Sequence, residues 1–454
     1  PMLEQSVAAG EMSPVINPAE PKDIVGYVRE ATPREVEQAL ESAVNNAPIW
    51  FATPPAERAA ILHRAAVLME SQMQQLIGIL VREAGKTFSN AIAEVREAVD
   101  FLHYYAGQVW DDFANETHRP LGPVVCISPW NFPLAIFTGQ IAAALAAGNS
   151  VLAKPAEQTP LIAAQGIAIL LEAGVPPGVV QLLPGRGETV GAQLTGDDRV
   201  RGVMFTGSTE VATLLLRNIA SRLDAQGRPI PLIAETGGMN AMIVDSSALT
   251  EQVVIDVLAS AFDSAGQRCS ALRVLCLQDE IADHTLKMLR GAMAECRMGN
   301  PGRLTTDIGP VIDSEAKANI ERHIQTMRSK GRQVFQAVRE NSEDAREWQS
   351  GTFVAPTLIE LDDFAELQKE VFGPVLHVVR YNRNQLPELI EQINASGYGL
   401  TLGVHTRIDE TIAQVTGSAH VGNLYVNRNM VGAVVGVQPF GGEGLSGTGP
   451  KAGG

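Results

Sequence analysis

Apolar positions recur at three- and four-residue spacing early in the chain. This spacing predicts a helix from Pro54 to Arg82, closed by Gly85, and a second helix from about Asn90 to Trp110. We expect these helices only to pack against a sheet. The opening 35 residues carry turn signals and little periodicity, so no regular element is predicted there.

Short, wholly apolar runs then alternate with helical stretches. The runs predict buried strands at residues 124–128, 150–154, 179–184, 202–206 and 231–234, separated by helices near 133–147, 160–173, 188–194 and 210–219. After Gly238 a second series predicts strands at 241–244, 273–277, 353–358, 376–381 and 421–426, with helices near 250–264, 280–293, 315–329 and 385–395. Such alternation is typical of parallel, doubly wound sheets, which bind nucleotides at the carboxyl ends of their strands. The pattern predicts an α/β fold with two domains.

Composition and charge exclude some classes of partner. The chain has 454 residues, more than a single core usually supports, and 51 acidic against 35 basic residues give a formal charge of −16. A polyanionic surface argues against nucleic acid and anionic membranes as partners. The stretch from Pro120 to Ala153 holds no charge, but prolines and amides interrupt it. A buried strand and helix therefore fit this stretch better than a membrane span.

The cysteines indicate the compartment in which the protein is expected, and the chain ends suggest how it relates to a longer protein. The four cysteines, Cys126, Cys269, Cys276 and Cys296, match no metal-binding spacing, so no metal site is predicted. Because so few cysteines suit a reducing compartment, we expect a cytoplasmic protein with free thiols. The N-terminus lacks the features of a signal peptide, and neither end closes with a regular element. The ends suggest a piece of a longer protein.

Three side chains next to predicted strands suggest catalytic chemistry. Cys269 lies in a loop between Gly266, which is expected to end a helix, and a strand; taken alone, such a cysteine is more often a core side chain. Glu235 follows a buried strand, where a carboxylate would face the ligand crevice and serve as a general base, although a helix cap or salt bridge is an alternative. Asn131 could donate to an oxyanion or cap a helix.

Three strand-to-helix turns suggest a nucleotide site. The turn from Gly185 to Gly191 has the spacing GxGxxxG, which differs from the usual dinucleotide fingerprint and is weak alone. In a second turn, Ser208 and nearby amides could meet a pyrophosphate at a helix N-terminus. In a third, Lys154 and Glu157 offer a cation and a carboxylate, and an acid placed there can hold ribose hydroxyls.

Seven sequence blocks, in order, resemble the aldehyde dehydrogenase superfamily from about Ser13 to Gly449. The blocks are Pro129–Pro133, Lys154–Pro160, Phe205–Ser208, Glu235–Gly238, Gly266–Cys269, Lys369–Pro374 and Pro439–Gly442. The resemblance implies an α/β fold with two doubly wound domains and a small oligomerisation hairpin. It implies an NAD-binding domain over residues 1–238 with the hairpin near 111–120, a catalytic domain over 239–426, and a substrate-anchoring loop with a truncated C-terminal segment over 427–454. The oligomeric state stays open, with a homodimer as one candidate.

The resemblance also implies roles for individual residues. Cys269 would be the nucleophile, Glu235 the general base, and Asn131 with the Cys269 amide the oxyanion hole. NAD is the implied cofactor: Lys154 and Glu157 would hold its adenosine ribose, and Glu370 and Phe372 its nicotinamide ribose and ring. The other implied cofactor contacts are Ser128, Pro129, Trp130, Gly187, Gly191, Thr206, Gly207 and Ser208.

Two segments narrow the resemblance: the residues after Cys269 and the late loop from Asn427 to Phe440. Both are similar to glutamate-semialdehyde (pyrroline-5-carboxylate) dehydrogenases, and most similar to the dehydrogenase module of the bifunctional proline utilisation A family. This implies oxidation of L-glutamate γ-semialdehyde to L-glutamate in proline catabolism, through a cysteine thioester, with a proline dehydrogenase module elsewhere in the full-length protein. The implied substrate contacts are the amides of Gly432 and Ala433, helped by Ser270, and Phe440. Neutral donors can hold a carboxylate without a fixed cation.

Three alternatives remain open at this stage. The substrate could be another small aldehyde, such as succinate semialdehyde. The chain could be a noncatalytic copy of the fold, although the joint presence of Cys269, Glu235 and Asn131 argues against that. A thioester-handling acyltransferase or hydrolase is the third, but it would not need the ribose-binding Lys154 and Glu157.

Overall fold

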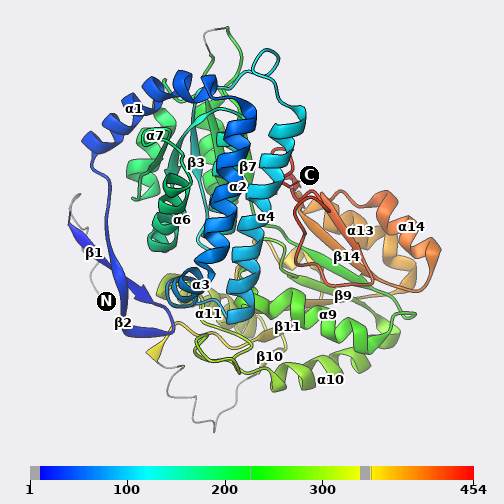
Figure 1. Cartoon of the computed structure of the whole chain (residues 1–454). Coiled ribbons are helices and arrows are strands. Elements are labelled where there is room, and N and C mark those ends of the chain that lie inside the picture. Colours follow the sequence, from blue (N-terminus) through cyan, green and yellow to red (C-terminus); the bar gives the residue numbers. More distant parts are fainter. Residues whose placement is uncertain (1–10, 225, 338–347, 349, 454) are drawn as a thin grey trace.

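Two largely parallel sheets with helices on both faces form the framework of the protein (Figure 1). The computed structural model describes residues 11–224, 226–337, 348 and 350–453. The first ten residues of the predicted NAD-binding domain and Gly454 of the predicted C-terminal segment lie outside this range. The α/β fold predicted from the sequence is confirmed, whereas the predicted domain boundaries stay predictions.

The first sheet is parallel throughout and has the strand order β5-β4-β3-β6-β7. Its strands are β3 (Pro123–Ile127), β4 (Ser150–Lys154), β5 (Val180–Leu182), β6 (Gly202–Thr206) and β7 (Leu232–Glu235). All five predicted strands form, with ends shifted by at most two residues. The strand order reverses at β3, since β4 lies on one side of it and β6 on the other. Ligands of such sheets bind at this switch point.

Both faces of the first sheet are buried because side chains on a strand alternate between faces. Val124 and Cys126 join the core formed with α2 to α6, whereas Val125 joins a second core with α1, α7 and α8. The helices are α1 (Pro33–Ala52), α2 (Pro55–Ser71), α3 (Met73–Glu83), α4 (Phe88–Asp112), α5 (Ala135–Ala146), α6 (Pro160–Glu172), α7 (Ala192–Gly196) and α8 (Thr209–Ile219). The uncharged stretch that begins at Pro120 thus forms β3 and α5. Among the described residues, no helix is long and apolar enough to span a membrane.

Two helix predictions in this half need correction. The single helix predicted from Pro54 to Arg82 is two helices, because the backbone of Gln72 leaves helical geometry while the apolar spacing continues across it. Helix α1 was not predicted, although its start has a clear signal. Thr32 and Glu35 form a capping box there, and Pro33 occupies the first turn.

The second sheet has the order β10-β11-β12-β9-β8-β14-β15, with only β10 antiparallel to its neighbour. Its strands are β8 (Ala241–Val244), β9 (Val274–Gln278), β10 (Val334–Gln336), β11 (Thr357–Leu361), β12 (Val375–Tyr381), β14 (Thr401–His405) and β15 (Asn423–Val426). Its helices are α9 (Thr250–Phe262), α10 (Asp279–Glu295), α11 (Ser314–Ser329), α13 (Leu386–Ala395) and α14 (Asp409–Ser418). The strand expected at residues 353–358 begins after Pro356, which lacks a backbone donor for the ladder.

Small antiparallel elements complete the fold. β1 (Met12–Asn17) and β2 (Glu20–Arg29) form a hairpin in the segment that showed little periodicity. The hairpin expected near residues 111–120 is absent, because this fully described segment contains only the end of α4 and a loop with a turn. There Phe113 stacks on His118, and Asn115 accepts a hydrogen bond from Arg58. A two-stranded hairpin without a packed face is marginally stable, so local packing prevails in this segment.

The C-terminal segment returns to the free edge of the first sheet. Thr236 N–H donates to Ser446 O at 3.0 Å, and Thr448 N–H donates to Ala234 O at 3.0 Å. β13 (Tyr398–Gly399) and β16 (Glu443–Gly444) pair nearby. The end of the described chain lies beside α4, between the two α/β regions (Figure 1). Residues from the far C-terminus therefore reach the end of β7, where Glu235 lies.

Candidate active site

A cavity of about 260 Å³ lies where the two α/β regions meet. It is lined by seven residues singled out from the sequence: Thr206, Glu235, Cys269, Ser270, Gly432, Ala433 and Phe440. Strand ends of the first sheet supply Thr206 and Glu235, the loop before β9 supplies Cys269 and Ser270, and the late loop supplies the rest. The structure thus brings the predicted nucleophile, base and substrate contacts together.

The loop that carries Cys269 begins with an unusual turn. Helix α9 ends at Phe262, four residues before Gly266, which was expected to end it. Ser264, Ala265 and Gly266 then take left-handed φ angles of 55°, 54° and 66°. A Cβ on Gly266 would stand 2.2 Å from the carbonyl oxygen of Gly373, so only glycine fits there. The correction arises because this close approach, and not helix termination, requires the glycine.

Arg273 holds the Cys269 loop against the loop that carries Glu370. Its side chain is fully buried and donates to the carbonyl oxygens of Gly266 and Arg268, at 2.7 and 3.0 Å. It also forms an ion pair with Glu370 at 2.9 Å. Buried guanidinium groups suit such planar, many-donor contacts. Sequence reasoning did not assign Arg273 a role, since its ion-pair partner Glu370 is distant in sequence.

Two titratable groups of the cavity, the Cys269 thiol and the Glu235 carboxyl group, have raised pKa values. Burial, followed by the nearby carboxylates of Glu370 and Glu235, raises the pKa of Cys269 to about 12. Burial raises the pKa of Glu235 to about 8, against the opposing effects of the Gly442 amide and the Lys451 ammonium. The Cys269 thiol is therefore protonated at neutral pH without a base, and Glu235 has a pKa suited to accepting a proton there.

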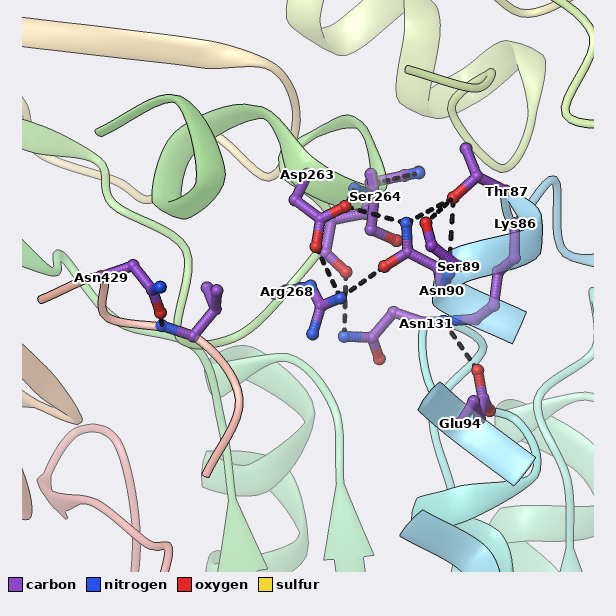
Figure 2. A network of polar contacts seen from close by, with 12 residues as sticks. Lys86, Thr87, Ser89, Asn90, Glu94, Asn131, Asp263, Ser264, Arg268 and Asn429 are labelled. Carbon is purple, nitrogen blue, oxygen red and sulfur yellow. Dashed lines mark hydrogen bonds and ion pairs between the residues drawn. The ribbon is translucent and has the colours of Figure 1, made fainter. Parts of the chain in front are cut away.

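Asn131 lies directly against the Cys269 loop (Figure 2). Its side-chain amide donates to Gln267 O at 3.2 Å, and the residue is 8% exposed. Glu94 of α4 accepts from the backbone N–H groups of Leu134 and Ala135, at 2.8 and 3.3 Å, and so caps the start of α5 just beyond Asn131. Asn131 therefore lies beside the loop that carries Cys269, while its role as a donor to an oxyanion stays a prediction.

Helix α4 does more than pack against a sheet, contrary to the expectation. Thr87, Asn90, Glu94 and Glu97 lie on one face of the helix, at the three- and four-residue spacing of a helical stripe. Asn90 and Asp263 both bind the Arg268 guanidinium (Figure 2). Glu97 lines the cavity. This polar stripe was visible in the sequence, but only the fold shows which face of α4 meets the cavity.

The predicted ribose-binding pair lies together beside the GxGxxxG turn. Lys154 is 3% exposed and its ammonium lies 3.8 Å from the Glu157 carboxylate. Glu157 Oε1 also accepts the Gly187 N–H at 2.7 Å, and Gly191 lies against the Lys154 stem. The turn from Gly187 to Gly191 is a π-helical turn that leads into α7, whereas an α-helical start was expected. Burial lowers the pKa of Lys154, and the Glu157 carboxylate opposes this effect.

The remaining predicted cofactor residues lie in a cleft beside Glu370, in the turn before α8 and just after β3. Trp130 and Phe372 contact each other edge to face at 5.5 Å, and both line a cleft together with Glu370. A Cβ on Gly237 would lie 1.7 Å from the Glu370 carboxylate, so this glycine leaves room for the carboxylate. Ser208 caps α8 through Val211 N–H at 3.3 Å, and Gly207 N–H donates to Glu235 O at 3.1 Å. Ser128 and Pro129 follow β3, with Ser128 buried and its hydroxyl without a partner among the described residues.

No cluster of three or more metal-ligating side chains occurs in the part of the chain that the structure describes. None of the four cysteines forms a disulfide; Cys126 and Cys276 are buried core residues, whereas Cys269 and Cys296 are half-buried. Of these, only Cys269 lines the cavity.

Comparisons with known proteins identify the family of the chain. Residues 6–454 match the sequence profile described as the aldehyde dehydrogenase family. The chain belongs to the aldehyde dehydrogenase family. Within it, the chain is 99% identical over 454 residues to the bifunctional protein PutA of Escherichia coli, covering all of this chain and 34% of that protein. The chain thus spans about a third of the length of this relative.

Two further aldehyde dehydrogenases match this chain over most of their own length. A 1-pyrroline-5-carboxylate dehydrogenase of Bacillus cereus is 36% identical over 97% of this chain and 86% of its own. The crystal structure of a 1-pyrroline-5-carboxylate dehydrogenase from Thermus with bound NAD is 37% identical. It aligns with a TM-score of 0.90 over 98% of this chain and 87% of its own. These similarities confirm the aldehyde dehydrogenase-like fold expected from the sequence.

Proposed function

We propose that this aldehyde dehydrogenase oxidises L-glutamate γ-semialdehyde to L-glutamate with NAD, in proline catabolism. The observation that carries the proposal is one cavity holding Cys269, Glu235 and the Gly432–Ala433 loop. The named activities of its relatives, pyrroline-5-carboxylate dehydrogenation above all, agree with it.

In the proposed reaction the Cys269 sulfur bonds to the aldehyde carbon. The thiol proton must first pass to Glu235 or to solvent, since burial holds the thiol pKa at about 12. Asn131 and the Cys269 amide stabilise the oxyanion that forms on the former carbonyl oxygen. Bound NAD supplies the acceptor for the hydride, and a thioester on Cys269 remains. Glu235 then takes a proton from water, whose oxygen attacks the thioester carbon and releases the acid and the Cys269 sulfur.

The residues around the first sheet fit NAD. Lys154 and Glu157 stand side by side at the GxGxxxG turn, where an ammonium and a carboxylate can hold the hydroxyls of the adenosine ribose. Glu370 and Phe372 stand at the opposite loop, with room made by Gly237, and would hold the nicotinamide ribose and ring. Arg273 orients Glu370 through their ion pair.

The walls of the cavity favour an amino-acid substrate. The backbone N–H groups of Gly432 and Ala433, with Ser270, would bind the α-carboxylate, and Arg268 adds a positive charge. Glu97 faces the same space and offers a carboxylate to an α-ammonium. Succinate semialdehyde has no ammonium to pair with Glu97, so it is the weaker candidate. Burial, with the nearby Glu94, raises the pKa of Glu97 to about 7, and an ammonium beside it would favour ionisation.

The activity would belong to one module of a longer protein. The chain spans 34% of its bifunctional relative, and a proline dehydrogenase module there would supply the precursor of the semialdehyde. We further propose a cytoplasmic location, consistent with four cysteines that form no disulfide.

The proposal is tested by monitoring NADH formation by absorbance, with the semialdehyde as substrate. We expect kcat/KM for glutamate semialdehyde to exceed that for succinate semialdehyde by at least about tenfold, because an unpaired buried carboxylate weakens binding. Equal values would refute the substrate assignment, and no NADH with either aldehyde would refute the activity. Cys269→Ala serves as the inactive control.

A further inference from the structure

A short C-terminal strap, residues 450–453, borders the cavity that holds Cys269 and Glu235, which its residues Pro450, Lys451 and Ala452 line. It pairs with the late loop: Phe440 N–H donates to Ala452 O, and Ala452 N–H donates to Phe440 O, both at 2.9 Å. Gly436 N–H also donates to Gly453 O at 2.7 Å. These backbone bonds determine the register of the strap, and so determine where the side chain of residue 451 begins.

The Glu235 carboxylate lies in a slot made of glycines. Its Oε2 accepts the Gly442 N–H at 2.9 Å. Its Oε1 is buried and has no hydrogen-bond partner among the described residues. A Cβ on Gly447 would stand 2.8 Å from that oxygen, so the slot leaves no room for a further side chain. Any countercharge for Glu235 must therefore come from outside the slot.

Lys451 lies just across Gly441 from Glu235. A Cβ on Gly441 would stand 3.0 Å from Lys451 Cγ and 3.1 Å from Glu235 Oε1, so the two side chains approach the same point beside this glycine. The Lys451 ammonium donates to Gly422 O. The charged or titratable side chains that act on Glu235 are thus Lys451 from the strap and Cys269 from the loop before β9. Of these two, only Lys451 is a cation.

We propose that Lys451 is the positioning residue for the charge of Glu235: its ammonium, held by the strap, stabilises the carboxylate that activates water for thioester hydrolysis. This rests on the proposed function, which assigns Glu235 as the base. The ammonium lowers the pKa of Glu235, against the larger effect of burial. Because Lys451 is exposed, solvent screens it, and we expect its loss to raise that pKa by at most about one unit.

The test compares Lys451→Met, which keeps the aliphatic stem, with Lys451→Arg, which keeps the charge. Quenched single turnovers, with enzyme in excess over the semialdehyde, report hydrolysis as glutamate that appears after NADH. The ring-opening equilibrium of the substrate is the same for both proteins, so it cancels when the variant rate is divided by the wild-type rate. For Lys451→Met we expect a ratio of about one tenth near pH 6 that rises toward one by about pH 9.5, because the carboxylate then ionises without help. Lys451→Arg, and the matched control Lys287→Met on α10, should stay near one throughout.

A double-mutant cycle separates this role from a structural one. In a Glu235→Gln background, Lys451→Met should change hydrolysis less than about twofold, since no carboxylate remains to stabilise. A ratio that does not vary with pH, or an equal loss in both backgrounds, would overturn the inference. A higher KM with a flat ratio would instead assign Lys451 to the substrate carboxylate. Wild-type protein that makes no NADH would refute the proposed function itself, which these variants do not test.

Discussion

Replacing Glu235 by Gln removes the proposed base and keeps the shape of the site. A glutamine carbonyl oxygen can still accept the Gly442 N–H, which Glu235 Oε2 accepts at 2.9 Å. The glycines that surround the carboxylate leave the isosteric amide room to fit. The variant should therefore fold, and the acyl-enzyme should form and accumulate.

The size of the effect follows from the raised pKa of Glu235. Removing a general base slows a reaction by about 10²–10⁴-fold. With a pKa of about 8, only about a tenth of Glu235 is ionised at pH 7. At pH 7 the Glu235→Gln variant should thus show a deficit in hydrolysis rate of about 10–10³-fold relative to the wild type. It should widen about tenfold by pH 9, since the active base form becomes populated as pH rises through 8.

Rapid mixing of enzyme, NAD and semialdehyde measures this directly. We expect a burst of NADH no larger than the enzyme concentration, followed by a slow steady rate. If Glu235 also deprotonates Cys269, the burst itself will slow, and this slowing should lessen at high pH as the thiol ionises. Wild-type steady rates in folded Glu235→Gln, or a deficit that stays constant with pH, would refute the reasoning. A purely structural glutamate predicts lower stability with little change in rate per folded molecule.

Three further predictions concern other parts of the site. Cys269→Ala should abolish NADH formation but leave NAD binding by titration unchanged, and residual turnover would mean that another group attacks. NAD should exceed NADP in kcat/KM, because Glu157 repels a 2′-phosphate, although Lys154 weakens this effect; equal use would contradict it. Arg273→Met should lower the free energy of unfolding by about 3–5 kcal/mol, because Glu370 would lose its buried partner. A loss below about 1 kcal/mol in denaturant titration would show that the ion pair is dispensable.

The elements that the sequence predicted well are those whose burial is visible locally. β3 and β4 are apolar throughout, so their positions follow from composition alone. β14 was missed because its apolar positions Leu402 and Val404 alternate with Thr401, Gly403 and His405, although all five residues are buried in the structure. Only neighbours on both sides, β8 and β15, make this strand internal.

The site residues also divide into those that local sequence motifs indicate and those whose surroundings only the fold brings together. Cys269, Glu235 and Asn131 lie in short motifs beside strand ends, where doubly wound sheets present their ligands, and the structure places them at one junction. Glu97, Arg273 and Lys451 carry no such motif. Their surroundings come from segments far away in the chain, as the contact of Arg273 with Glu370 shows.

The sequence by itself therefore determined the alternation of strands and helices and the family, and it singled out Cys269 and Glu235 as the proposed nucleophile and base, because these depend on local pattern and short motifs. The tertiary structure decided which charges meet in the cavity. It turned one face of α4 toward Cys269, joined the Cys269 loop to Glu370 through Arg273, and brought Lys451 across Gly441 to Glu235. The physical reason is that burial and charge proximity, which shift the pKa of Glu235 to about 8 and that of Cys269 to about 12, depend on distances between segments that are separated along the chain.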